Sequence, residues 1–135
     1  MSRIGILGAG QLGRMLGLAG IAMGHELRFF DSNSSVPASA VGELVCADFG
    51  DELKLDSFCS GLDVVTYEFE NVPLRSAERV SRILPLFPPA QALAVSQDRF
   101  REKSFFKKLG IATPRFALIA EGGAEAQCAA VQQAL

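Results

Sequence analysis

Three glycines near the start of the chain form a pattern that can bind phosphate, in the stretch IGILGAGQLGRML. Gly8, Gly10 and Gly13 make G-x-G-x-x-G between a short apolar run and a helical pattern. The first glycine permits a tight turn, the second lets a phosphate approach the backbone, and the third allows the helix to pack closely on the strand. The loop therefore predicts binding of a phosphorylated ligand at a helix N-terminus.

Two sets of residues point to different ligands for this loop. Asp31 ends the second predicted strand, where dinucleotide-binding folds place an acid that binds the ribose. Gln11 and Arg14 are long and polar, whereas a dinucleotide pyrophosphate usually meets small or apolar neighbours there. The loop alone leaves both a nicotinamide or flavin dinucleotide and another phosphorylated ligand open.

A second group of polar residues follows the clearest strand pattern, in DVVTYEFENVP. Tyr67, Glu68 and Glu70 are expected at its carboxyl end, the edge at which open α/β sheets bind ligands. An extended backbone would point Glu68 and Glu70 to the same side. Such carboxylates suit a ligand with amino or hydroxyl donors, and a solvated strand end is the alternative.

A third group lies on a predicted helix, in SQDRFREKSFFKKLG. Ser96 is expected as the N-cap with Asp98 in the first turn. The expected buried face consists of Phe105, Phe106 and Leu109. A basic stripe runs along the helix, formed by Arg99, Lys103 and Lys107. This stripe predicts either a solvated face or, through Arg99, a clamp for a phosphate group.

The elements that must position these residues alternate between strand and helix patterns. Strands are expected at residues 3–7, 26–31, 43–47, 63–69 and 84–87. Helices are expected at residues 12–23, 51–61 and after Pro73. This alternation predicts an α/β fold with a Rossmann-like, doubly wound parallel sheet.

Helical faces follow from the spacing of apolar residues. In the first helix the apolar positions at helical spacing are Leu12, Met15, Leu16, Ala19, Ala22 and Met23. Gly17 and Gly20 in the same helix predict close packing against the sheet. In the second helix the residues expected to face inward are Leu53, Leu55 and Phe58.

The pattern changes after Pro88 and Pro89. Helices are expected at residues 90–95 and 97–109, then a strand at 115–120 and a helix at 125–135. A strand and helix at this position bury little on their own, so the chain is expected to be cut off at its C-terminus.

The composition of the chain limits the classes of protein to which it can belong. The chain has 135 residues, 49% of them hydrophobic, and a formal net charge of −2, which disfavours nucleic acid as a partner. We expect no membrane span and no signal segment, and hence a soluble cytoplasmic protein. Cys46, Cys59 and Cys128 are expected to be reduced and mostly buried, and His25 has no neighbours at metal-ligand spacing.

Taken together, three stretches resemble the 5-(carboxyamino)imidazole ribonucleotide synthase family of ATP-grasp enzymes. They are GILGAGQLGRML, DVVTYEFENVP and QDRFREKSFFKKLGIATP, and the resemblance covers about residues 3–119. It implies a pre-ATP-grasp domain at residues 1–96, and a linker helix with the beginning of the central ATP-grasp domain at residues 97–135.

The resemblance also implies the chemistry. Such enzymes use ATP, Mg²⁺ and bicarbonate to carboxylate aminoimidazole ribonucleotide in purine biosynthesis, giving ADP and phosphate by way of carboxyphosphate. By resemblance, Gly10, Gln11, Leu12 and Glu68 face the ribonucleotide, and Arg99 reaches ATP. It implies no catalytic residue and no metal ligand in this stretch, and assigns no role to Tyr67, Glu70, Lys103 or Asp31.

Family members continue for two further domains, which supply most contacts to ATP and Mg²⁺. By the same resemblance, the full-length synthases are commonly homodimers. We therefore expect the 135-residue chain to be inactive by itself. Two alternatives remain open: the Rossmann domain of an NAD(P)-dependent oxidoreductase, and a non-catalytic nucleotide-binding module.

Overall fold

The computed structural model of the protein describes residues 1–118, 127–129 and 131–132. The chain divides into two compact units, Met1–Leu93 and Ala94–Leu135. Within the described ranges, no helix has the length and apolar character needed to cross a membrane.

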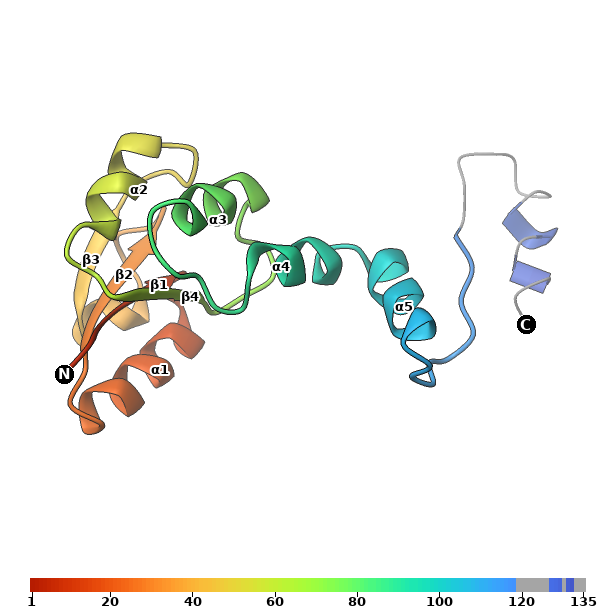
Figure 1. The fold of residues 1–135 in the computed structure, drawn as a ribbon, viewed down its shortest axis with the longest axis horizontal. Coiled ribbons are helices and arrows are strands. Elements are labelled where there is room, and N and C mark those ends of the chain that lie inside the picture. The colour runs from red at the N-terminus through yellow and green to blue at the C-terminus, as the bar shows by residue number, and fades with distance from the viewer. Residues whose placement is uncertain (119–126, 130, 133–135) are drawn as a thin grey trace. The chain divides into compact units, whose positions relative to one another are not determined.

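Residues 1–93, all of them described, build a parallel sheet of four strands in the order β3-β2-β1-β4 (Figure 1). The strands are β1 (Arg3–Leu7), β2 (Glu26–Asp31), β3 (Glu43–Cys46) and β4 (Val64–Tyr67). The register aligns Leu7 with Phe30 on one side and with Tyr67 on the other. The carboxyl ends of β1, β2 and β4 therefore meet at one edge, and the predicted α/β fold with a parallel sheet is confirmed.

Helices cover both faces of this sheet (Figure 1). They are α1 (Gln11–Ala22), the short 3-10 helix η1 (Pro37–Ala40), α2 (Glu52–Cys59) and α3 (Leu74–Ser81). The face under α2 and α3 holds a cluster of large side chains that includes Phe30, Leu55, Phe58 and Val80. The face under α1 and η1 holds a smaller cluster: Ile6, Ala9, Leu27, Phe29 and Ala38.

The helix α1 packs on the sheet through glycine. Its buried residues are Gly13, Gly17 and Gly20, which confirms close packing at the last two. The large apolar residues of the same helix are exposed, among them Leu12, Met15, Leu16, Leu18 and Ile21. The apolar positions that follow helical spacing therefore mark a face that points away from the sheet.

Two further details of the first unit differ from expectation. Leu53 is 81% exposed, whereas Leu55 and Phe58 of the same helix are buried. Residues 84–87 do not form a strand but a single bridge between Val65 and Leu86. Pro85 precedes Leu86 and has no N–H to donate, so the ladder does not extend.

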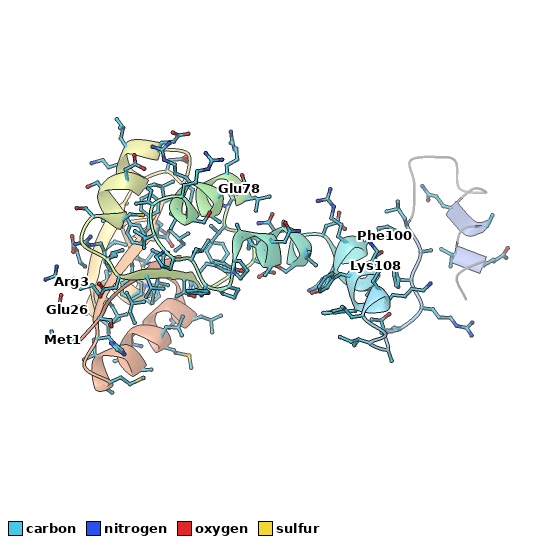
Figure 2. The ribbon with its side chains drawn as sticks, viewed as in Figure 1. Met1, Arg3, Glu26, Glu78, Phe100 and Lys108 are labelled. Atoms are coloured by element: carbon cyan, nitrogen blue, oxygen red, sulfur yellow. The ribbon has the colours of Figure 1, made fainter. Side chains whose placement is uncertain are left out.

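Ion pairs join elements on the surface of the first unit. At the amino-terminal edge of the sheet, Arg3 Nε lies 3.0 Å from Glu26 Oε2 (Figure 2). Arg79 of α3 reaches α2, with Nη2 at 2.6 Å from Asp56 Oδ2 and Nη1 at 2.7 Å from Glu52 Oε2. The hydrogen bond from Arg79 lowers the pKa of Asp56.

The cysteines are free thiols in the structure. Cys59 is buried, and burial raises its pKa to about 11. Cys46 and Cys128 are exposed, so the expectation of mostly buried cysteines is wrong for these two. Cys46 ends the outer strand β3, which has a neighbour on one side only.

Two helices follow the sheet: α4 (Ala90–Ser96) and α5 (Arg99–Lys108). The N-cap of α5 is Asp98, whose side chain accepts a hydrogen bond from Arg101 N at 2.8 Å. Ser96, expected as the cap, instead ends α4. No residue of α5 is buried, so the expected buried face of Phe105, Phe106 and Leu109 is not formed by the described residues.

The last expected elements lie partly outside the described residues. Of the strand expected at residues 115–120, residues 115–118 have no strand structure, and 119–120 are not described. Of the helix expected at residues 125–135, residues 127–129 and 131–132 are helical.

Candidate functional site

The glycine loop lies between the carboxyl end of β1 and the start of α1. Gly8 has φ +98°, a conformation that side-chain-bearing residues rarely adopt, and its N–H donates to Phe30 O at 2.8 Å. Gly10 is the N-cap of α1 and has no side chain with which to satisfy the first N–H groups. The loop must therefore obtain its hydrogen-bond acceptors from elsewhere.

Glu68 supplies two of these acceptors. It follows the last residue of β4, and its N–H donates to Leu7 O at 3.1 Å, which places it beside the loop. Its Oε1 accepts from Gly10 N at 2.7 Å, and its Oε2 accepts from Gly13 N. Gly10 and Glu68, predicted to belong to one site, are in direct contact.

Asp31 supplies a third acceptor. It ends β2, and its Oδ2 accepts from Ala9 N at 2.9 Å, while its Oδ1 accepts from Asn33 N at 2.9 Å. The acid that a dinucleotide fold would offer to a ribose is thus bound to the backbone of the loop. Sequence reasoning missed this use, although Asp31 ends the strand that pairs with β1.

Gln11 and Leu12 begin α1 on the exposed side of the loop. Both are exposed, and the side chain of Leu12 is open to solvent over more than half its surface. Arg14, the only charged residue of α1, is also exposed. These three exposed side chains belong to the first turn of α1, directly after the loop.

Tyr67 and Glu70 flank Glu68 in sequence. Tyr67 ends β4, and partial burial raises its pKa. Because the strand ends there, Glu68 and Glu70 do not share an extended backbone, and their expected placement on one side of a strand is wrong. Glu68 is half-buried and bound to the loop, whereas Glu70 is exposed.

Arg99 belongs to the second unit. It is the first residue of α5, its side chain is 80% exposed, and its Nη1 lies 2.7 Å from Glu102 Oε2. Lys103, also on the predicted basic stripe, has its Nζ 5.6 Å from the centre of the Phe116 ring. Among the described residues, no group of three or more His, Cys, Asp or Glu side chains could hold a metal ion.

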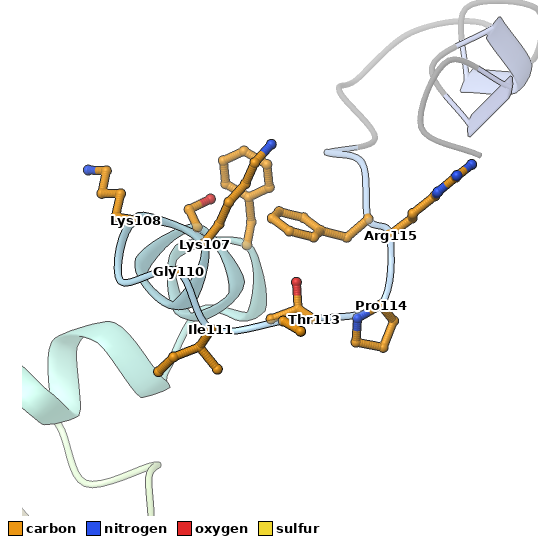
Figure 3. A pocket seen from close by; sticks show the side chains of 11 residues that line it. Lys107, Lys108, Gly110, Ile111, Thr113, Pro114 and Arg115 are labelled. Atoms are coloured by element: carbon orange, nitrogen blue, oxygen red, sulfur yellow. The ribbon is translucent and has the colours of Figure 1, made fainter.

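An open pocket of about 900 Å³ lies within the second unit, between α5 and the segment that follows it (Figure 3). Lys107, Lys108 and Arg115 supply three positive charges to its lining. Phe100 and Phe116 also line it and pack edge to face with ring centroids 5.7 Å apart. Sequence reasoning missed this pocket, because its lining joins the helix to residues 110–116, which have no regular pattern.

The part of the chain that holds the glycine loop matches a known family. A family model described as the ribonucleotide synthetase preATP-grasp domain matches residues 1–97. The chain belongs to this family. The matched residues include the glycine loop, Asp31 and Glu68.

Individual relatives carry a more specific name. N5-carboxyaminoimidazole ribonucleotide synthase of Pseudomonas aeruginosa is 44% identical over 115 residues, covering 85% of this chain and 32% of that protein. The crystal structure of the corresponding synthetase from Thermus thermophilus is 51% identical with a TM-score of 0.90, covering 98% of this chain and 36% of that one. The resemblance seen in the sequence is confirmed.

A second similar structure contains ligands. N5-carboxyaminoimidazole synthase from Aspergillus clavatus, in complex with ADP and 5-aminoimidazole ribonucleotide, is 26% identical with a TM-score of 0.86, covering 98% of this chain and 36% of that one. This chain therefore spans about a third of the length of the relatives it matches.

Proposed function

We propose that this chain is the N-terminal part of an ATP-dependent ligase that carboxylates aminoimidazole ribonucleotide with bicarbonate, giving ADP and phosphate. The observation that carries this proposal is the match to the Thermus thermophilus synthetase over 98% of this chain at a TM-score of 0.90. In this proposal, residues 1–96 are the pre-ATP-grasp domain and residues 97–135 begin the central ATP-grasp domain.

The ribonucleotide is proposed to bind at the carboxyl edge of the sheet, against Gly10, Gln11, Leu12 and Glu68. Glu68 supports this role because its carboxylate already holds the loop and can accept further hydrogen bonds from a hydroxyl or amine. Leu12 and Gln11 support it because they are exposed beside the loop. Their part is to bind and orient the amine that receives the carboxyl group.

ATP is proposed to contact Arg99, whose planar guanidinium suits a phosphate. This single exposed cation is not enough to hold a triphosphate, and the described residues offer no cluster for Mg²⁺. The remaining ATP contacts and the Mg²⁺ ligands are therefore assigned to the part of the synthase that this chain does not cover. When bound, ATP and Mg²⁺ supply activation of bicarbonate through carboxyphosphate. The full-length protein is proposed to be a cytoplasmic homodimer.

The alternative of an NAD(P)-dependent oxidoreductase has an observation against it. Two N–H groups at the N-terminus of α1, those of Gly10 and Gly13, already donate to Glu68, so a pyrophosphate there would meet a carboxylate. A titration of NADH fluorescence with the protein tests this alternative, and a saturable change at millimolar cofactor or below would support it.

Two substitutions in the full-length synthase test the proposed roles. Glu68→Ala should raise the KM for aminoimidazole ribonucleotide far more than the KM for ATP, and Arg99→Ala should do the reverse. Glu26→Ala and Arg101→Ala are matched controls, because they remove the same charges at exposed positions of β2 and α5. Equal effects on both substrates would contradict the two assignments.

The 135-residue chain provides a second test. Incubated with ATP, Mg²⁺, bicarbonate and aminoimidazole ribonucleotide, it should release no phosphate above the background without protein. Turnover by the chain alone would overturn the assignment of ATP and Mg²⁺ binding to the remaining part of the synthase.

A further inference from the structure

We propose that Glu68 is a built-in anion that closes the glycine loop to the phosphate groups of ligands. In this view, the G-x-G-x-x-G pattern of this chain is shaped around a carboxylate of the protein rather than around a bound phosphate. Glu68 then determines specificity, because it decides which chemical groups the loop accepts. The inference concerns the amides of this chain and does not depend on the proposed reaction.

The hydrogen bonds at the loop are the first observation that supports this proposal. A phosphate at a helix N-terminus binds by accepting hydrogen bonds from unpaired backbone N–H groups. Here both oxygens of Glu68 already accept such bonds, Oε1 from Gly10 N at 2.7 Å and Oε2 from Gly13 N. Ala9 N donates to Asp31 Oδ2 at 2.9 Å. A phosphate that bound the amides of Gly10 and Gly13 would have to displace a carboxylate that makes two charge-assisted hydrogen bonds.

The second observation concerns the three glycines of the loop, because all of them leave room for the side chain of Glu68. A Cβ added to Gly8 would lie 2.5 Å from Glu68 Cγ. A Cβ on Gly10 would lie 2.9 Å from Oε1, and a Cβ on Gly13 would lie 3.1 Å from Oε2. A side chain at Gly8 or Gly10 would therefore collide with Glu68, and one at Gly13 would force the carboxylate to shift, so all three glycines favour this position of Glu68.

The third observation is the negative charge that surrounds the loop. The carboxylates of Glu68 and Asp31 together accept hydrogen bonds from three backbone N–H groups of the loop. A ligand phosphate brought to the same amides would be repelled by both, and the half-buried setting weakens the screening by solvent. Arg14, the one cation of α1, is exposed and makes no ion pair with Glu68 among the described residues.

The test compares anion binding by the 135-residue chain and its variants, with pyrophosphate as the probe. Amide shifts of Gly10 and Gly13 are followed by NMR in ¹⁵N-labelled protein at neutral pH and constant ionic strength. In the wild-type chain, these shifts should not saturate at millimolar pyrophosphate. In Glu68→Ala, they should saturate, with an affinity at least tenfold higher than that of the wild type.

Two further variants complete the design. Glu26→Ala removes the same charge at the amino-terminal edge of the sheet, so its response should equal that of the wild type. Glu68→Gln keeps the size of the side chain and loses its charge, so it should gain affinity even if Glu68→Ala fails to fold.

Two results would overturn the proposal. One is saturable binding of pyrophosphate at Gly10 and Gly13 in the wild-type chain with the affinity of the variants. The other is a folded Glu68→Gln or Glu68→Ala chain that gains no affinity. Neither result bears on the proposed ligase activity, which is measured by substrate turnover in the full-length protein.

Discussion

The two faces of the sheet are packed in opposite ways. Under α2 and α3, large side chains fill the space: the rings of Phe30 and Phe58 pack edge to face, with centroids 5.5 Å apart. Under α1, the helix contributes only glycines to the buried surface, and its backbone approaches Phe29 and Leu27 closely. One face is held by side chains from the sheet and from both of its helices, whereas on the other face the sheet, Ala9 and η1 supply side chains and α1 supplies none.

This difference shows that helical spacing of apolar residues does not say which surface they meet. In α2 the buried positions Leu55 and Phe58 lie on the sheet, as expected for an apolar stripe. In α1 the apolar stripe is exposed, and the glycine stripe lies on the sheet. The close approach of α1 brings its N-terminus next to the end of β4, which is the geometry that Glu68 uses.

The largest effect is expected for Phe58→Ala. The ring is fully buried in the side-chain-packed face, so its removal should lower the free energy of unfolding by about 3–5 kcal/mol. Urea unfolding followed by circular dichroism measures the change. Leu53→Ala in the same helix is the control, because Leu53 is 81% exposed and its loss should change little. A similar loss in both variants would contradict the described packing of α2.

A smaller loss of stability is expected for Gly17→Ala, because this substitution adds an atom to a tightly packed contact whereas Phe58→Ala removes a whole ring. The added Cβ would lie 2.6 Å from Val41 Cγ2 and 3.0 Å from Phe29 Cζ, so either the helix or these side chains must shift. Overpacking costs about 1–3 kcal/mol, and the higher helix propensity of alanine offsets about 1 kcal/mol of it. The same urea titration should therefore show a net loss of stability.

Gly20→Ala is the matched variant for that experiment. Its Cβ would lie 3.0 Å from Leu27 Cδ2, at the end of a flexible side chain, so less strain is expected than at Gly17. If both substitutions increased stability, α1 would not be packed through its glycines.

A still smaller loss of stability is expected when the ion pairs that join α2 to α3 through Arg79 are removed. Arg79→Met keeps the aliphatic stem and removes the ion pairs with Asp56 and Glu52. The folded pKa of Asp56 is below its unfolded value, so its contribution to stability is present above the unfolded pKa and is lost as pH falls through the folded pKa. The loss caused by the substitution should therefore be larger at about pH 7 than at about pH 2. An equal loss at both values would mean that Arg79 acts through packing alone.

Much of the fold follows from the sequence, because strand and helix patterns alternate and glycines mark the turns. The strand pattern placed Glu68 at the carboxyl edge of the sheet, and the family resemblance placed Gly10 and Glu68 in one site. It did not predict that Glu68 binds the loop itself. That contact joins residues 58 positions apart and depends on β4 lying next to β1, a strand order that local patterns do not determine.

Two other differences have separate causes. The exposed face of α1 depends on how closely the helix approaches the sheet, which the glycines permit but the spacing of apolar residues does not reveal. The missing strand at residues 84–87 depends on Pro85, which has no N–H for the ladder. The exposed face of α1 thus depends on contacts between segments, whereas Pro85 is a local signal that the expected strand at residues 84–87 did not take into account.

The smallest change in stability is expected at Leu18, an exposed apolar residue of α1. Leu18 is 50% exposed, and alanine favours the helix, so Leu18→Ala should change the free energy of unfolding by no more than about 0.5 kcal/mol. Leu55→Ala makes the same chemical change at a residue that is 1% exposed and should lower stability by about 2–5 kcal/mol. The pair isolates burial from residue type, and urea unfolding measures both. Equal losses would mean that Leu18 of α1 is buried as Leu55 is, and the contrast between the two faces would then fail.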